Sequence, residues 1–240
     1  MSRNDISQLA EMSTGILRKA VEEHGASVIF LTSFGAEDMV ITHLAHSAGL
    51  NIRHVSIDTG RLPEETYNLM ERTTRKYGVM PEVLFPERKS VEEMVAAKGM
   101  NHFYESRANR EECCHVRKVE PLQRALSGVS AWISGIRRDQ TSVREKASSE
   151  EVDSAHGGIT KYNPLIDWTS ADIWEFISEN SVPYNSLFDR GYRSIGCAPC
   201  TRAVRPWEEE RSGRWWWETG AKECGLHTVG SNPFIFQRSE

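Results

Sequence analysis

The chain has 240 residues, of which 39% are hydrophobic and 26% are charged, and its formal net charge is −5. The length allows one α/β domain with a proper core, and the composition excludes a disordered chain. No apolar run approaches the roughly 18 residues of a membrane span, and the negative charge argues against a broad nucleic-acid surface. Because the polar N-terminus resembles neither a signal nor a transit peptide, we expect a cytoplasmic protein.

The first part of the chain alternates between helix and strand patterns. Apolar residues at helical spacing predict a helix over 7–24, and the apolar run at 27–32 predicts a buried strand. Further strands are predicted at 52–57 and 81–85, and helical patterns follow the first two strands. Such alternation indicates an α/β fold in which helices cover both faces of a parallel sheet.

The later part of the chain continues this alternation until about Pro183 and then loses its periodicity. The polar stretch 141–158 predicts a loop. The other predicted elements are a helix over 116–126, strands over 130–134 and 158–162, and a helix that begins at Thr169 or Ser170.

Polar turns that contain glycine follow three of the predicted strands, at 33–38, 58–61 and 135–140. The carboxyl ends of parallel strands share one edge of a sheet, so these turns are expected on one rim. The first turn opens a helix, whose free backbone N–H groups suit a phosphate, and Ser33 and Gly35 fit that role. An ordinary strand-to-helix connection explains any single turn equally well, but their coincidence favours a ligand site.

The five cysteines divide into an adjacent pair, a C-x-x-C and a single residue. They are Cys113, Cys114, Cys197, Cys200 and Cys224. In a reducing cytosol such cysteines are metal ligands or catalytic thiols more often than disulfides. Four thiolates hold zinc or an iron–sulfur cluster, and the spacing leaves both open beside a vicinal disulfide or plain buried thiols. The arithmetic therefore predicts one four-thiolate site and one reactive thiol.

The single cysteine, Cys224, lies between Lys222 and His227. Nearby cations favour the nucleophilic thiolate, although an incidental exposed cysteine fits the local context as well. Upstream, Arg211 and Arg214 are three residues apart, so both side chains are able to grip an anion from one helix face. The tryptophans at 215–217 are interpreted mainly as interface packing, which predicts a homo-oligomer.

Taken together, these motifs resemble the assimilatory adenylyl-sulfate and phosphoadenylyl-sulfate reductases over residues 27 to 228. The adjacent cysteine pair and the C-x-x-C resemble the cysteine motifs of the branch of these reductases that carries a 4Fe-4S cluster. The segments that carry the resemblance are 33–38, 58–61, 135–140, 162–165, 190–197 and 222–227.

The resemblance implies a Rossmann-like parallel sheet of the adenine nucleotide alpha-hydrolase type with a C-terminal catalytic tail. We expect one domain overall, with a nucleotide-binding and cluster-binding part over 1–195. The second cluster-ligand loop and the tail then occupy 196–240. The implied reaction is reduction of adenosine 5′-phosphosulfate to sulfite and AMP in sulfate assimilation and cysteine biosynthesis, with thioredoxin or glutaredoxin as the thiol donor.

The resemblance also assigns roles to individual residues. Cys224 is expected to attack sulfur and to carry an S-sulfonate, with His227 and Lys118 beside it. Four cysteines, Cys113, Cys114, Cys197 and Cys200, are expected to hold the 4Fe-4S cluster. The expected substrate-binding residues are Ser33, Gly35, Asp58, Arg137, Arg211 and Arg214.

Three alternatives remain open at this point. One is a dual reductase that also accepts the 3′-phosphorylated substrate, and no residue in the chain excludes it. A second is an ATP-dependent tRNA sulfurtransferase relative, but Phe34, Ala36 and Glu37 break the Ser-Gly-Gly-x-Asp-Ser loop of that class. A third is a non-catalytic iron–sulfur sensor, which would not need Cys224.

Overall fold

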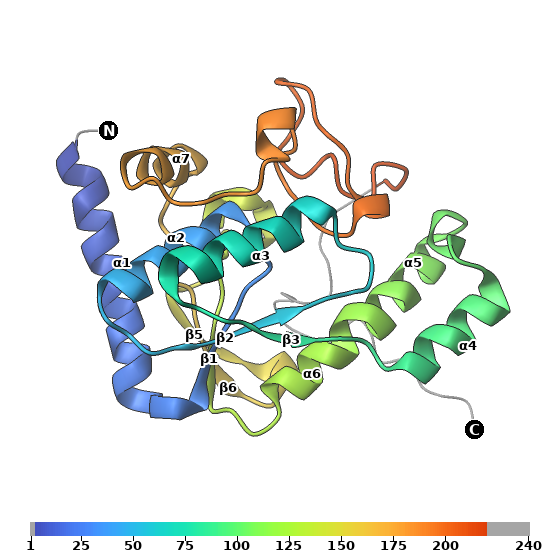
Figure 1. The fold of residues 1–240 in the computed structure, drawn as a ribbon, viewed down its shortest axis with the longest axis horizontal. Helices are drawn as coiled ribbons and strands as arrows, with labels where there is room; N and C mark the ends of the chain where they lie inside the picture. Colours follow the sequence, from blue (N-terminus) through green and yellow to red (C-terminus); the bar gives the residue numbers. More distant parts are fainter. Residues whose placement is uncertain (1–2, 220–240) are drawn as a thin grey trace.

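The computed structural model describes residues 3–219. They form three layers, with a six-stranded sheet between two groups of helices (Figure 1). The strand order is β3-β2-β1-β4-β6-β5, and every neighbouring pair is parallel except β5 and β6. The predicted α/β fold with a largely parallel sheet is confirmed.

The strands at the centre of the sheet are buried on both faces. This is why β1 and β4 read as continuous apolar runs in the sequence rather than as alternating patterns. The strands are β1 (Val28–Leu31), β2 (Arg53–Ile57), β3 (Glu82–Leu84), β4 (Ala131–Ile133), β5 (Glu150–Asp153) and β6 (Ile159–Tyr162).

The larger part of the core lies on one face of the sheet, where fully buried side chains such as Leu17, Met39 and Leu69 pack against Phe30 and Ile133. The helices on this face are α1 (Arg3–His24), α2 (Ala36–Ser47), α3 (Glu64–Tyr77) and α7 (Ser170–Glu179). A capping box at Thr169 opens α7, which confirms the predicted start of that helix.

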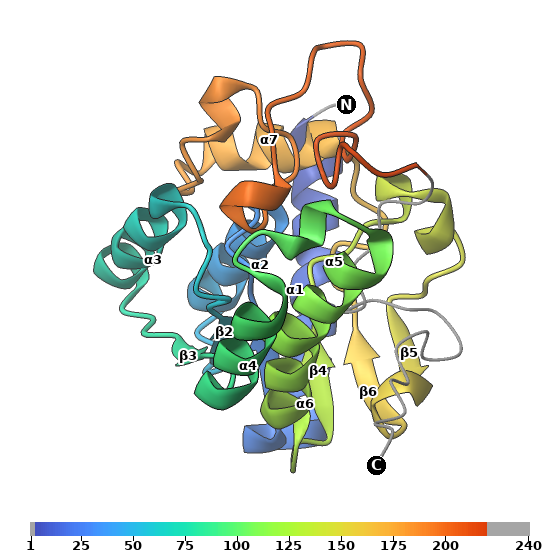
Figure 2. The same ribbon diagram turned by 90° about the vertical axis from the view of Figure 1, so that its right-hand side faces the viewer.

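The opposite face carries a smaller core, in which Leu122 and Leu126 pack against Ile29, Val55 and Trp132. The helices that cover this face in Figure 2 are α4 (Arg88–Lys98), α5 (Arg107–Cys114) and α6 (Glu120–Leu126). A single π-helical turn over 115–119 joins α5 to α6, so the three segments form one continuous helical rod. Such π turns are often found at functional sites.

The segment 141–158, predicted as a loop, contains the edge strand β5. Its residues Glu150-Glu151-Val152-Asp153 carry no apolar run, so the strand pattern is absent from the sequence. Antiparallel pairing with β6 and the ion pair between Glu151 and Lys161 hold it in place. The strand therefore depends on its neighbour rather than on its own propensity.

Beyond α7, the described chain to residue 219 contains short 3-10 turns and one isolated bridge between Thr201 and Arg214. This segment crosses the carboxyl edge of the sheet (Figures 1 and 2). The amide of Ala198 donates to the carbonyl of Arg61, which fastens the segment to the turn after β2. The predicted division between residues 195 and 196 stays a prediction.

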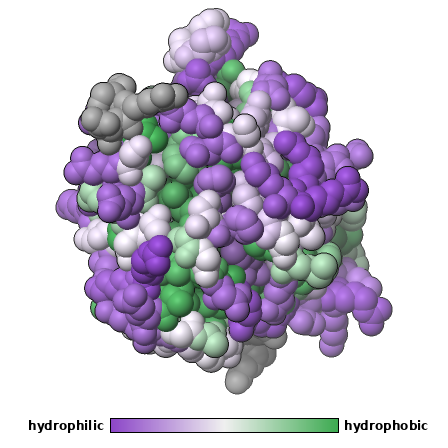
Figure 3. Space-filling view, turned by 60° about the vertical axis from the view of Figure 1, so that its left-hand side comes forward, coloured by the Kyte–Doolittle hydropathy of each residue, from purple (hydrophilic) through white to green (hydrophobic). Residues whose placement is uncertain are grey.

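The surface agrees with the ordinary charged composition of the chain. One face is mostly hydrophilic, with hydrophobic side chains lying between hydrophilic ones (Figure 3). Among residues 3–219, none of the helices combines the length and the apolar character that crossing a membrane requires.

Candidate active site

The turn after β1 is organised around the buried carboxylate of Asp38, in the first turn of α2. Its Oδ2 atom accepts hydrogen bonds from the Ser33 amide at 2.6 Å, the Ser33 hydroxyl at 2.9 Å and the Gly35 amide at 3.4 Å. Burial raises the pKa of Asp38 to about 6. The backbone N–H groups of Ser33 and Gly35, expected to be free for phosphate, therefore donate to a carboxylate of the chain itself.

The turn after β2 is held in the same way by Asp58. Its carboxylate accepts from the Gly60 amide at 2.7 Å and from the Tyr67 hydroxyl at 2.9 and 3.0 Å. Burial and the neighbouring Asp58 raise the pKa of Tyr67 to about 12. The next residue, Thr59, places its hydroxyl 3.3 Å from the thiol of Cys197. Asp58 thus stabilises the turn after β2, while Thr59 contacts Cys197 in the segment beyond α7.

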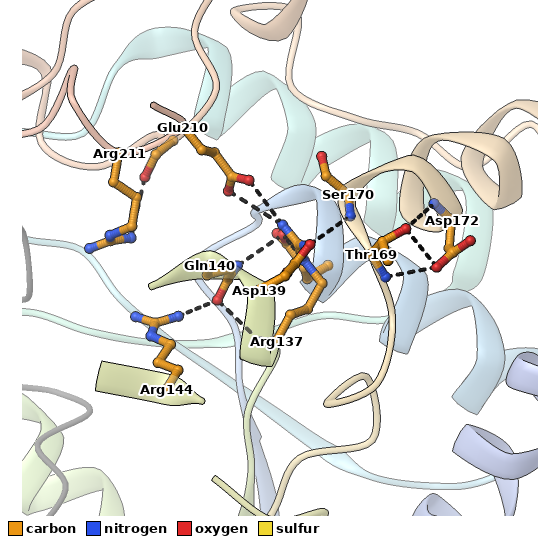
Figure 4. Close-up of polar contacts among 11 residues, drawn as sticks. Arg137, Asp139, Gln140, Arg144, Thr169, Ser170, Asp172, Glu210 and Arg211 are labelled. Carbon is orange, nitrogen blue, oxygen red and sulfur yellow. Dashed lines mark hydrogen bonds and ion pairs between the residues drawn. The ribbon is translucent and has the colours of Figure 1, made fainter. Parts of the chain in front are cut away.

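The turn after β4 approaches the first turn closely at Gly135. A Cβ atom at Gly135 would lie 2.4 Å from the Asp38 Oδ1 atom, so a larger residue would collide with the turn after β1. Two residues later, the Arg137 side chain is 1% exposed and contacts three carboxylates, of which Figure 4 labels Asp139 and Glu210. Its partners are Glu37, Asp139 and Glu210.

The three turns and the segment beyond α7 enclose a pocket of about 180 Å³ at the carboxyl edge of the sheet. Ser33 and Gly35 line it, whereas the side chains of Asp58 and Arg137 are outside its lining. Basic side chains from four separate parts of the chain converge on it. They are Lys118, Arg144, Arg193, Arg211 and Arg214. Such a concentration of cations suits a small ligand with several negative charges.

Two of these cations, Arg144 and Arg193, were not singled out from the sequence. Arg144 is buried and donates to the side-chain oxygen of Gln140 in the turn after β4. It follows that turn within the stretch taken as a featureless loop. Arg193 lies inside the segment 190–197, which carried part of the family resemblance. That motif was the available signal for Arg193, whereas only the fold brings Arg144 to the pocket.

The four cysteines Cys113, Cys114, Cys197 and Cys200 line one small cavity of about 20 Å³. The first two end α5, whereas Cys197 precedes the 3-10 turn 198–200 and Cys200 ends it. All four are free thiols, so the vicinal disulfide considered from the sequence is not formed. Burial raises the pKa of Cys114 and of Cys200 to about 12. The structure therefore brings together the four residues predicted to share one site.

The donor set around this cavity is all thiol, with neither a carboxylate nor an imidazole in its lining. Within residues 3–219, no group of three or more His, Cys, Asp or Glu side chains has the geometry to hold a single metal ion. The buried indole N–H of Trp217, in the hydrophobic cluster around the cysteines, has no hydrogen-bond acceptor in the described chain. Four soft ligands around one cavity fit an iron–sulfur group.

Lys118 lines both the pocket and the cysteine cavity. It lies in the π-helical turn 115–119, four residues after the second cysteine of the pair. The two sites are therefore neighbours that share one cation. Cys224 and His227, the predicted nucleophile and its neighbour, lie outside the described residues.

Comparisons with known proteins find relatives of this chain in one family of reductases. Residues 27–203 match the family described as the phosphoadenosine phosphosulfate reductase domain. A relative from Burkholderia cepacia, named adenosine 5′-phosphosulfate reductase, is 47% identical over 95% of this chain and 91% of its own length. One of the same name from Allochromatium vinosum is 48% identical over 84% of this chain and 78% of its own length.

Solved structures give the same picture for the fold. The phosphoadenylyl-sulfate reductase of Candida auris, in a phosphate complex, matches with a TM-score of 0.68 and 30% identity over 85% of this chain and 98% of that chain. An FMN adenylyltransferase from Candida glabrata matches with a TM-score of 0.59 at 18% identity, covering 81% of this chain and 62% of that chain, which shows a shared fold only.

Proposed function

This chain belongs to the phosphoadenosine phosphosulfate reductase domain family, and from that premise we propose that it reduces adenosine 5′-phosphosulfate to sulfite and AMP. The observation that carries the proposal is the convergence of five basic side chains on one pocket at the carboxyl edge of the sheet. A phosphosulfate carries two negative charges, which such a pocket neutralises. The name shared by relatives at 47–48% identity supports this substrate.

The proposed chemistry begins with the thiolate of Cys224, which attacks the sulfur of the substrate. The bond from sulfur to the phosphate oxygen breaks, AMP leaves with the electron pair, and Cys224 carries an S-sulfonate. A thiolate of thioredoxin or glutaredoxin then attacks the Cys224 sulfur and displaces sulfite. A second thiol of the donor resolves the mixed disulfide, so the donor dithiol supplies both electrons and Cys224 is regenerated.

The basic residues of the pocket are proposed to neutralise the negative charge of the substrate during these steps. Lys118, Arg211 and Arg214 are proposed to hold the phosphosulfate, so that a thiolate is able to approach an anionic substrate, and their position in the pocket lining supports this role. His227 is proposed to lie beside the nucleophile. The step needs little acid–base assistance, because AMP is a good leaving group.

We also propose that Cys113, Cys114, Cys197 and Cys200 hold a 4Fe-4S cluster, which the all-thiol cavity supports. When bound, this group would supply negative charge and rigidity beside the pocket rather than electrons. Lys118 lines both cavities, so it would couple the cluster electrostatically to the substrate pocket. Iron and sulfide analysis of the anaerobic protein tests this, and a colourless protein with stoichiometric zinc would contradict it.

The activity test measures sulfite release under anaerobic conditions with reduced thioredoxin. We expect turnover by the native protein, none by Cys224→Ser, and none when the thioredoxin thiols are alkylated. Without reductant, mass spectrometry should find one SO₃ group added at Cys224. Sulfite release by Cys224→Ser at the native rate would overturn the mechanism.

Parallel assays with the 3′-phosphorylated substrate separate the alternatives. Equal turnover of both substrates would identify a dual reductase, and turnover of the 3′-phosphorylated form alone would refute the proposed substrate. Use of thioredoxin or glutaredoxin, assembly into a homo-oligomer and location in the cytoplasm remain predictions of the same proposal.

A further inference from the structure

Arg137 is a buried arginine that joins carboxylates from three separate parts of the chain, and Figure 4 shows it with Asp139 and Glu210. Its Nε atom donates to Glu37 Oε1 at 2.9 Å, at the start of α2. Its Nη2 atom donates to Glu210 Oε2 at 3.1 Å, and its Nη1 atom contacts Asp139. All three nitrogens of the guanidinium fork therefore face carboxylates rather than the pocket.

We propose that Arg137 is a positioning residue, which fixes the loop 202–214 so that Arg211 and Arg214 face the pocket. This inference rests on the proposed function, because those two arginines are the residues assigned to the phosphosulfate. Arg137 is absent from the pocket lining, whereas Glu210 and Arg211 belong to it. The guanidinium instead contacts Glu210, a residue of that lining, and borders a neighbouring hollow that Glu37 and Glu210 also line.

The carboxylate of Glu210 needs this partner. Burial and the nearby charge of Glu37 raise the pKa of Glu210 above its ordinary value, whereas Arg137 acts to lower it. Two acidic side chains thus meet at one buried cation, and without that cation they would repel each other. Loss of Arg137 would therefore drive Glu210 away from Glu37. The part of loop 202–214 around Glu210 would then detach from the turn after β4.

A short turn transmits this constraint to the arginines. Arg211 follows Glu210 directly, and the amide of Arg214 donates to the carbonyl of Arg211 at 2.9 Å. The base of the loop is closed separately, because the Arg202 amide donates to the Gly213 carbonyl at 3.0 Å. Arg137 therefore controls the direction of a loop whose base is already fastened.

Gln140 supports the same contact from the turn after β4. Its side-chain nitrogen donates to Glu37 Oε1 at 3.0 Å, and its side-chain oxygen accepts from the Arg137 amide at 3.2 Å. The same oxygen accepts from Arg144, which lines the pocket. The network thus joins the tethered loop to a further basic residue of the site.

The first test measures the loop without any substrate. Trypsin cleavage after Arg211 should be about 10-fold faster in Arg137→Ala than in the native protein, because loss of one buried tether raises the population of open loop. Arg53→Ala is the matched control, since it removes an arginine–glutamate pair at the opposite edge of the sheet. Unchanged cleavage in Arg137→Ala would overturn the proposal.

The second test measures the site. Arg137→Ala should raise the KM for adenosine 5′-phosphosulfate about 10-fold with a smaller change in kcat, and Arg137→Lys should restore part of the loss because it keeps one charged donor. In an Arg211→Ala background, the same substitution should raise KM by clearly less than 10-fold, since only the part of the effect that acts through Arg214 remains. Additive effects would show that Arg137 acts elsewhere and would overturn the proposal.

If Arg137→Ala does not fold, Glu210→Ala replaces it, because it cuts the same tether and leaves Arg137 paired with Glu37 and Asp139. Glu210→Ala is expected to show the same proteolysis and KM changes, and native values in both would overturn the proposal. A native protein without any sulfite release would refute the proposed function instead, and the proteolysis result would still decide whether Arg137 tethers the loop.

Discussion

The sheet edge and the segment beyond α7 contribute to one pocket by different physical means. Strands β1, β2 and β4 are held by backbone ladders and buried apolar side chains. The described segment beyond α7 contains neither an α-helix nor a strand, and its loop 202–214 depends on turns and ion pairs such as Arg202–Glu208. The sheet therefore provides a rigid frame, and the segment provides charges on polar tethers.

This difference predicts which property a substitution in each region should change. A change in the frame disturbs burial and should lower the free energy of unfolding, whereas a change in the tethered segment should alter ligand binding with less effect on stability. Two glycines make the contrast direct. A Cβ atom at Gly135 would meet the fixed carboxylate of Asp38, while one at Gly196 would meet the guanidinium end of Arg214.

The largest effect is expected for Arg214→Ala in the tethered segment. Arg214 is 5% exposed, lies over the Trp215 ring and lines the pocket. Loss of a preorganised cation should reduce kcat/KM for adenosine 5′-phosphosulfate by about 10²–10³-fold. Arg205→Ala, in the same loop but outside the pocket lining, is the control and should retain native kinetics. A loss below 3-fold for Arg214→Ala would break the comparison.

The second prediction concerns pH and the frame. The folded-state pKa of Asp38 is about 6, above the ordinary value of 3.8, so the folded protein binds this proton more tightly than the unfolded chain. Its contribution to stability is complete below the unfolded pKa and is lost as the pH rises through about 6. At about 1.4 kcal/mol for each of roughly two pKa units, the loss reaches about 3 kcal/mol.

Urea unfolding of the native protein and Asp38→Asn at several pH values measures this term. The stability advantage of the native protein over Asp38→Asn should shrink between about pH 4 and pH 7. Asp167→Asn, which changes a half-exposed carboxylate, is the control and should show no such trend. A constant difference between native protein and Asp38→Asn would contradict the prediction.

The third prediction is Gly135→Ala, which tests the frame by steric means. The added methyl group would lie 2.4 Å from a carboxylate that Ser33 and Gly35 already hold, so the turn must shift. Overpacking of this kind should lower the free energy of unfolding by about 1–3 kcal/mol. Gly15→Ala, in α1 with no atom within 4 Å of the new Cβ, is the control and should be neutral or stabilising.

The smallest effect is expected for Gly196→Ala. Its Cβ would lie 2.2 Å from Arg214 Nη2, which is the far end of a long side chain and is able to shift without moving the backbone. We expect the KM to rise about 10-fold with less than about 1 kcal/mol of lost stability. If Gly196→Ala unfolded the protein as readily as Gly135→Ala, the distinction between frame and tethered segment would fail.

The sequence alone determined the frame of this protein. The apolar runs of β1 and β4, the helical periodicity of α1 and the polar turns after the strands follow from local hydropathy and backbone preferences, which neighbouring residues set. The edge strand β5 was not predicted, because three of its four residues are acidic and only pairing with β6 makes it a strand. The grouping of the cysteines was also readable, since counting and spacing carry it.

Only the tertiary structure decided which charges face each other. After β4, an arginine that contacts a ligand and one that is buried among carboxylates look the same in sequence. Glu210, 73 positions further along the chain, makes Arg137 the second kind. The π-helical turn likewise brings Lys118 to two cavities at once. Local sequence sets dihedral angles and burial, but electrostatic partners depend on how distant segments pack, which no local pattern records.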